Sequence, residues 1–260
     1  MSEFTHVLII LAAIVTNIIA IKKFAYNEEN QPSCDNYVFN TYLYVLLLFL
    51  IMSIILVLSY NNIGFENIIH GIFSSWFGFI SFMIVYIALF FTLQSLSPKR
   101  NQLALYITWL GLIIMFTILM HFPIKIAHVK GFLQSGIFIT LCLVSAMSYL
   151  GIKHGDYLVK FDWDAYLGYA LIGLILTYMI IPFLGDIGNM NNIYIYISIF
   201  SLIIFCLLLL SFNKQLVETS KTCYEDNNPN YPLESIKIGT KIINILQDII
   251  NIKSRLKKRA

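Results

Sequence analysis

TYLYVLLLFLIMSIILVLSY, the stretch from Thr41 to Tyr60, contains no Asp, Glu, Lys or Arg. A helix needs about 20 apolar residues to cross the hydrocarbon core of a bilayer. Lipid offers no partners for backbone N–H and C=O groups, so such stretches cross the membrane as helices. Uncharged stretches also cover His6–Ile21, Gly71–Leu96, Leu103–Phe122, Gly131–Ile152, Ala165–Leu184 and Ile193–Phe212. The sequence therefore predicts an all-α, polytopic helical membrane bundle with seven apolar spans.

The composition leaves little of the 260-residue chain outside the membrane. Apolar residues make up 58% of it and charged residues 12%, whereas a soluble domain averages about 25% charged residues. No P-loop, glycine-rich phosphate motif or nucleophile–base pair is present, and the histidines are scattered without metal-binding spacing. We therefore expect a non-enzymatic protein without catalytic residues, metal or cofactor. Its partners are expected to be the lipid bilayer and other membrane proteins, not nucleic acid.

The cysteines show no spacing typical of a metal site or of a disulfide-rich domain. Cys34, Cys142, Cys206 and Cys223 are widely separated, so we expect neither a zinc site nor a disulfide framework. Gly168 and Gly173 share one predicted span with other small residues. Small residues allow helices to approach closely in membranes, so this span is expected to pack tightly against a neighbour.

The distribution of basic residues predicts the orientation of the chain in the membrane. With seven spans, one face carries 15 Lys and Arg residues and the other face carries 2. The rich face includes Lys22, Lys23 and everything after Phe212. Basic residues favour the cytoplasmic or matrix side, so this count places the N-terminus outside and residues from Asn213 onward inside.

The segment Ser235–Ile252, SIKIGTKIINILQDIINI, differs from the predicted spans because it is amphipathic. Its apolar residues recur at helical spacing, and the opposite stripe consists of Lys237, Lys241, Asn244, Asp248 and Asn251. Such a helix can lie on the membrane surface. It can also insert into the bundle with its polar stripe against protein. If it spans the membrane, the five basic residues after Ile252 change sides and charge no longer decides the orientation.

Several motifs in order along the chain resemble the Bax-inhibitor family of membrane proteins. They are Gly131–Ile152, Lys160–Gly168, Ser211–Gln215, and Tyr231–Ile236 leading to Ile242–Leu246. The chain is most similar to the mitochondrial branch of that family, the growth-hormone-inducible transmembrane proteins. Asn40–Tyr44, Ser97–Arg100 and the basic ending Lys257–Arg259 carry that similarity, together with the extra N-terminal helix. The resemblance implies an extra helix and polar loop at 1–35, a Bax-inhibitor-like membrane domain at 36–256, and a basic tail at 257–260. It also implies that the last helix is surrounded by the others.

The family's paired-aspartate sensor, which is thought to gate a calcium leak with pH, is degenerate in this chain. Asn213 stands where the family has the first aspartate, and an amide does not titrate. For the second aspartate, a gapless alignment gives Lys241 followed by Asn244, and a seven-residue slip gives Asp248 followed by Asn251. We favour the gapless alignment. In either case the two carboxylates that would share a proton are absent.

Three functions follow from this resemblance and its departures. The first is a non-enzymatic Bax-inhibitor-like protein of the mitochondrial inner membrane that maintains membrane organisation or modulates cation flux. The second is a structural accessory subunit of a larger, respiratory-type membrane complex, which the lost aspartate favours. The third is a calcium leak channel or cell-death modulator of endoplasmic-reticulum, Golgi or viral membranes.

Overall fold

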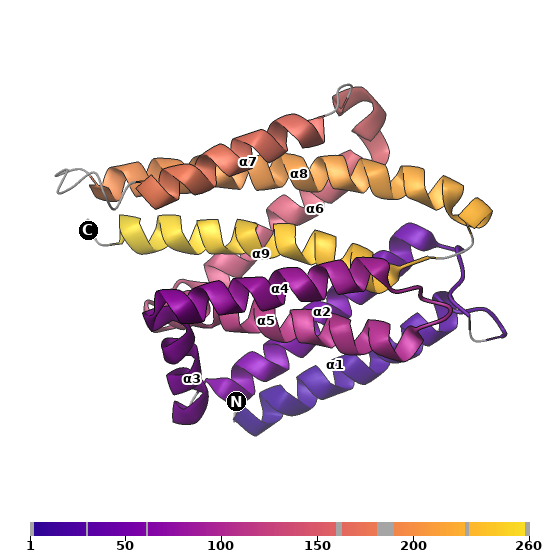
Figure 1. Ribbon diagram of the computed structural model, residues 1–260, viewed down its shortest axis with the longest axis horizontal. Coiled ribbons are helices and arrows are strands. Elements are labelled where there is room, and N and C mark those ends of the chain that lie inside the picture. Colours follow the sequence, from indigo (N-terminus) through magenta and orange to yellow (C-terminus); the bar gives the residue numbers. More distant parts are fainter. Residues whose placement is uncertain are drawn as a thin grey trace. The chain divides into compact units, whose positions relative to one another are not determined.

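The computed structural model describes residues 3–29, 31–60, 62–159, 163–180, 190–226 and 229–257. Regular structure in these ranges is helical, and an isolated antiparallel bridge pairs Tyr26 with Pro32 (Figure 1). The helices are α1 (Glu3–Phe24), α2 (Tyr37–Ser59), α3 (Ile63–Ser74), α4 (Trp76–Ser95), α5 (Gln102–Val129), α6 (Leu133–Leu158), α7 (Trp163–Ile180), α8 (Met190–Asp226) and α9 (Tyr231–Leu256). The predicted all-α class is confirmed.

Six of the described helices are long and apolar enough to cross a membrane, which supports an integral membrane protein. The six are α1, α2, α4, α5, α6 and α8. In α7 the apolar stretch Ala165–Leu174 is shorter, and residues 181–184 of the predicted span lie outside the described part of the chain. The described helices therefore leave the predicted count of seven spans open.

The predicted span Gly71–Leu96 is interrupted, which corrects the sequence analysis. Helix α3 ends at Ser74, and Ser75 adopts an extended conformation before α4 begins at Trp76. The Ser75 side chain accepts a hydrogen bond from the backbone N–H of Gly78, 3.0 Å away. Serine is a favoured N-cap because its oxygen satisfies a free N–H of the first turn. A second cap, Asn62, starts α3 in the same way by accepting from the Phe65 N–H.

Two helices are longer than the sequence analysis predicted. Helix α5 continues through Pro123 to Val129, although a loop was expected to start at residue 123. Helix α8 continues beyond Phe212, where the predicted span ended, through the polar segment as far as Asp226. Residues 213–226 contain no glycine or proline, and an ion pair of 3.5 Å joins Lys214 to Glu218 one turn later. Both features favour helix in this polar segment.

The chain divides into two compact units. Unit 1 comprises residues 1–121 and 220–239, and unit 2 comprises residues 122–219 and 240–260. In unit 1, α1 packs along α2, and α3 packs against α4. The first turns of α9 also belong to unit 1, where a Cβ on Gly239 would lie 3.0 Å from the Leu48 side chain. This close approach indicates that α9 packs directly on α2.

In unit 2, helices α6 and α8 approach closely. A Cβ on Gly151 would lie 2.5 Å from the carbonyl oxygen of Leu210 and 2.7 Å from the Cβ of Asn213. A Cβ on Gly155 would meet the Lys214 side chain at 2.8 Å. By contrast, none of the described atoms lies within 4 Å of the corresponding position at Gly168 or Gly173. Helix α7 does pack against a neighbour, as expected, but through Leu167 and Leu174, which meet Ile204 of α8. The close glycine contacts lie instead at Gly151 and Gly155.

Candidate functional site

Helix α9 is enclosed along its length. Every residue from Tyr231 to Arg255 is buried or half-buried, and exposure begins at Leu256. A helix lying flat on a bilayer would leave its polar face open to water. Of the two arrangements that the sequence allowed, this burial favours insertion of α9 among other helices.

In unit 1, the first turns of α9 are held by a cluster of aromatic side chains. The Tyr231 ring stacks on Tyr44 of α2 with centroids 5.6 Å apart. The Trp109 indole N–H of α5 donates a 2.9 Å hydrogen bond to the Ser235 hydroxyl. Asn40 of α2 donates to the Tyr231 hydroxyl at 3.4 Å. Stacked rings and a satisfied buried indole fix the start of α9 against α2 and α5.

Three tyrosine hydroxyls meet beside this cluster. Tyr26, Tyr44 and Tyr106 are hydrogen bonded to one another, with 3.1 Å between the Tyr26 and Tyr44 oxygens and 2.7 Å between Tyr44 and Tyr106. Gln102 donates to the Tyr26 hydroxyl at 3.4 Å. The triad therefore satisfies polar groups that would be costly to bury alone.

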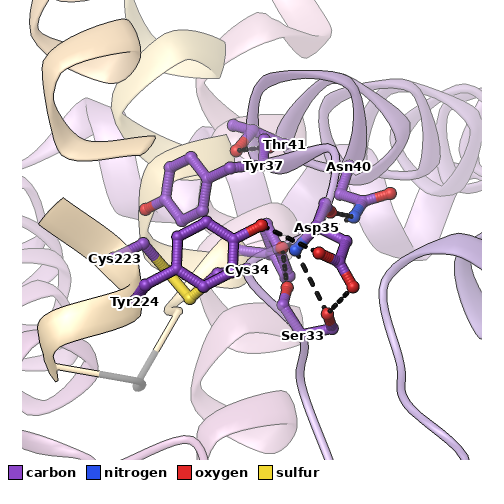
Figure 2. Close-up of a disulfide and its surroundings, with 9 residues drawn as sticks. Ser33, Cys34, Asp35, Tyr37, Asn40, Thr41, Cys223 and Tyr224 are labelled. Carbon is purple, nitrogen blue, oxygen red and sulfur yellow. Dashed lines mark hydrogen bonds between the residues drawn. A yellow bond between two sulfur atoms is a disulfide. The ribbon is translucent and has the colours of Figure 1, made fainter. Parts of the chain in front are cut away.

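A disulfide joins Cys34 to Cys223, which corrects the expectation that no disulfide forms. The two Cα atoms are 5.8 Å apart, and 189 positions of sequence separate the cysteines. Figure 2 shows the bridge beside the Tyr224 ring, whose hydroxyl donates a 2.8 Å hydrogen bond to a carboxylate oxygen of Asp35. One sequence signal was available: the charge count had placed the segment after Lys23 and the segment after Phe212 on the same face of the membrane.

The carboxylate of Asp35 is held by two hydroxyl groups. Tyr224 donates to one oxygen, and Ser33 donates to the other at 2.9 Å. Because both bonds favour the charged form, with Tyr224 the larger effect, the pKa of Asp35 is lower than its ordinary value. The Tyr231 hydroxyl also donates to the carbonyl of Ser33. The loop after α1 is thus joined to the end of α8 and to the start of α9 by separate contacts.

In unit 2, the sequence-predicted sensor position Asn213 is fully buried on α8. Its side-chain NH2 group donates to the carbonyl oxygen of Leu209 at 2.7 Å and to the Ser148 hydroxyl of α6 at 3.4 Å. These two hydrogen bonds hold the Asn213 amide in the contact between α8 and α6. A carboxylate at this place would accept from Ser148 but would meet the Leu209 carbonyl without a proton to share.

The two alignments proposed for the second sensor position have different places on α9. The Lys241 ammonium lies over the Phe212 ring, 4.3 Å from its centroid, so Lys241 is at the level of Asn213. Asp248 is two turns further along α9 and lies within interaction range of Ser201 and Cys206 of α8. The geometry therefore brings Lys241, and not Asp248, to the level of Asn213.

Asp248 is the buried charged residue of the polar stripe, with 5% of its surface exposed. One of its carboxylate oxygens, Oδ2, has no hydrogen-bond partner in the described structure. Burial of the ionised carboxylate is costly, because the hydrogen bond with Ser201 replaces only part of its lost hydration.

The other stripe residues make short-range contacts. Lys237, in unit 1, forms a 2.9 Å ion pair with Glu234 one turn earlier. In unit 2, Asn244 donates to the carbonyl of Thr240 at 2.8 Å, and Asn251 is half-buried. These contacts lie within α9 itself, so they stabilise the helix without indicating a ligand.

Within unit 2, basic side chains join the last turns of α9 to the neighbouring helices. Lys253 donates to the Ser135 hydroxyl at the start of α6, and Lys130 donates to Ser254, each at 2.8 Å. The Arg255 guanidinium lies over the Tyr194 ring of α8, 4.2 Å from its centroid. On the apolar face of α9, Ile250 packs with Ala127 and Phe132.

Lys241, Asp248 and Arg255 are seven residues apart and therefore lie on one face of α9, and this face runs along α8.

The described residues offer no group of three or more His, Cys, Asp or Glu side chains that could hold a metal ion. Comparisons of the chain with protein-family models, curated proteins and solved structures found no match.

Proposed function

We propose that this chain is a non-enzymatic, Bax-inhibitor-like integral membrane protein in which the family's pH-gated calcium leak has been lost. Its role would be structural: it would bind other membrane proteins as a subunit of a larger complex and help to organise the membrane. The motifs from Gly131 to Leu246 suggest the family, and the enclosure of α9 agrees with the central last helix that the resemblance implies. The proposed domain layout is that of the sequence analysis: an extra helix and loop at 1–35, the membrane domain at 36–256 and a basic tail.

The residues around Asn213 are the main support for the proposed loss of the calcium leak. An uncharged, hydrogen-bonded amide and a lysine over Phe212 occupy the level at which the resemblance implies two carboxylates. Two carboxylates sharing a proton would attract Ca²⁺ and respond to pH. A fixed positive charge at that level repels a divalent cation instead.

The experiment is a calcium-flux assay on the purified, disulfide-bonded chain in liposomes, at about pH 6 and about pH 8. The wild-type chain is expected to give the same slow leak as protein-free liposomes at both pH values. The double variant Asn213→Asp, Lys241→Asp restores two carboxylates at one level, and the matched control Asn244→Asp, Asn251→Asp adds two carboxylates elsewhere on α9. A leak through the wild-type chain that changes with pH would refute the proposal.

The disulfide bears on which membrane holds the protein. The resemblance favours the mitochondrial inner membrane, but disulfides persist in oxidising compartments such as the endoplasmic-reticulum lumen or the exterior of a virion. The Cys34–Cys223 bridge therefore favours, as a second candidate, a relative acting in a secretory-pathway or viral membrane. Imaging of the tagged full chain against markers of both organelles distinguishes the two.

A further inference from the structure

The disulfide of unit 1 constrains how the chain crosses the membrane. Cys34 follows α1, and Cys223 is in the last turn of α8. The bridge does not stand alone, because Tyr224 donates to Asp35 at 2.8 Å and Tyr231 donates to the carbonyl of Ser33 beside it. Three separate contacts thus hold the loop after α1 against the segments that end α8 and begin α9. The two cysteines must lie on the same face of the membrane.

The number of crossings between the two cysteines is therefore even. In the described part of the chain between them, five helices are long and apolar enough to span: α2, α4, α5, α6 and α8. Five crossings would leave Cys34 and Cys223 on opposite faces of a hydrocarbon core about 30 Å thick. Their Cα atoms are 5.8 Å apart. One more crossing is required.

Helix α7 is the element that supplies the missing crossing. Helix α3 has 12 residues, and at 1.5 Å per residue it is only about 18 Å long. Helix α7 has 18 residues, which gives about 27 Å, close to the thickness of the hydrocarbon core. We infer that α7 spans the membrane and that the Cys34–Cys223 bridge marks the oxidising face. This inference stands independently of the Bax-inhibitor proposal.

The chemistry of the bridge sets the orientation. Two thiols lose two protons and two electrons when the S–S bond forms, and a protein disulfide of the thiol-oxidising machinery takes them up as two new thiols. This exchange takes place in the secretory lumen, outside the cell or in comparable compartments, and is rare in the cytosol. The loop after α1 and the end of α8 therefore face the oxidising side. The N-terminus, one crossing earlier, faces the reducing side.

The charge pattern does not oppose this orientation once α9 also crosses. The cysteine face then carries eight basic residues, Lys22, Lys23, Lys99, Arg100, Lys153, Lys160, Lys214 and Lys221. The opposite face carries seven, Lys125, Lys130, Lys253, Arg255, Lys257, Lys258 and Arg259. Charge is then nearly balanced and gives no orientation. The disulfide reverses the orientation that the charge count predicted for seven spans, and both termini lie on the reducing face.

The first part of the test establishes the bridge. The full chain is alkylated rapidly in its own membranes, with and without prior reduction, and peptides containing Cys34 and Cys223 are identified by mass spectrometry. We expect a linked peptide that disappears on reduction and in the variants Cys34→Ser and Cys223→Ser. Recovery of both residues as free, alkylated thiols from unreduced membranes would overturn the inference.

The second part locates each loop with a membrane-impermeant maleimide on sealed vesicles, before and after permeabilisation. New thiols come from Lys153→Cys before α7, Gly185→Cys after α7 and Leu256→Cys at the end of α9, and Cys34→Ser frees Cys223. The parent chain, whose Cys142 and Cys206 lie in spans, is the control. We expect Lys153→Cys to label from the same side as the freed Cys223, and the other two from the opposite side. Labelling of Lys153→Cys and Gly185→Cys from the same side would show that α7 does not cross.

Discussion

Replacement of Gly151 by alanine tests the close contact between α6 and α8 in unit 2. The new Cβ would lie 2.5 Å from the Leu210 carbonyl oxygen and 2.7 Å from the Asn213 Cβ. Neither atom is the end of a flexible side chain, so the two helices have to move apart. Overpacking of this kind costs about 1–3 kcal/mol, and contact with backbone places the cost toward the upper end.

A second glycine in a helix provides the matched control. Alanine for glycine gains about 1 kcal/mol of helix propensity at either site. At Gly168 nothing lies within 4 Å of the new methyl group, so Gly168→Ala is expected to retain that gain. The two variants share the propensity term. Their difference in unfolding free energy is therefore the overpacking cost alone, about 2–3 kcal/mol in favour of Gly168→Ala.

The assay is equilibrium unfolding of the purified chain in mixed micelles, followed by tryptophan fluorescence with SDS as denaturant. Gly151→Ala is expected to unfold at lower SDS than the wild-type chain, and Gly168→Ala at the same or higher SDS. Equal midpoints for the two variants would refute the close approach of α6 and α8 at Gly151.

Three further predictions concern the disulfide, the α5–α9 contact and the buried carboxylate. Reduction of the Cys34–Cys223 disulfide should lower the free energy of unfolding of the wild-type chain by about 2–4 kcal/mol, because the disulfide closes a long loop. The same reduction should not change the free energy of unfolding of the Cys34→Ser variant. An equal loss in the wild-type chain and the variant would contradict a stabilising role for the disulfide. Trp109→Phe and Ser235→Ala should each lower the free energy of unfolding by about 0.5–1.5 kcal/mol. The double variant should lose little more than either single variant, since both substitutions remove the same 2.9 Å hydrogen bond. Additive losses in this double-mutant cycle would argue against that bond. Asp248→Asn should leave the free energy of unfolding unchanged or raise it, since the neutral amide carries no charge for burial to penalise. A loss of more than about 2 kcal/mol in SDS unfolding would indicate a partner for the ionised carboxylate.

Six long apolar helices were predictable, because the bilayer imposes a length and a polarity that a sequence displays directly. The amphipathic Ser235–Ile252 segment was also recognised as a helix, and the structure extends it to Tyr231–Leu256. Its burial was not decided by the pattern, because a polar stripe suits either water or protein partners. Contacts with α8 at Phe212 and Tyr194 decide it, and these depend on residues distant in the sequence.

Other features were beyond local sequence reasoning. The break at Ser75 depends on one hydrogen bond to the Gly78 N–H, and uncharged residues on both sides concealed it. The pairing of Cys34 with Cys223 spans 189 positions and requires the fold to bring the loop after α1 to the end of α8. The tight glycine contact occurs at Gly151 because α8 crosses there, whereas Gly168 offered the same residue type without a neighbour.

From Thr240 onward, α9 packs against α6 and α8 of unit 2 and does not lie on the membrane surface. Cysteine cross-linking of Gly136→Cys on α6 with Ile250→Cys on α9 tests it most directly. A Cβ on Gly136 would lie 4.0 Å from Cγ1 of Ile250, so side chains at the two positions are in contact, and two cysteines whose side chains meet can be oxidised to a disulfide. In native membranes treated with a mild oxidant, we expect a rapid intramolecular cross-link for this pair and none for Gly168→Cys with Ile250→Cys. Failure of the first pair to cross-link, with both thiols open to a water-soluble maleimide, would show that α9 does not pack against α6.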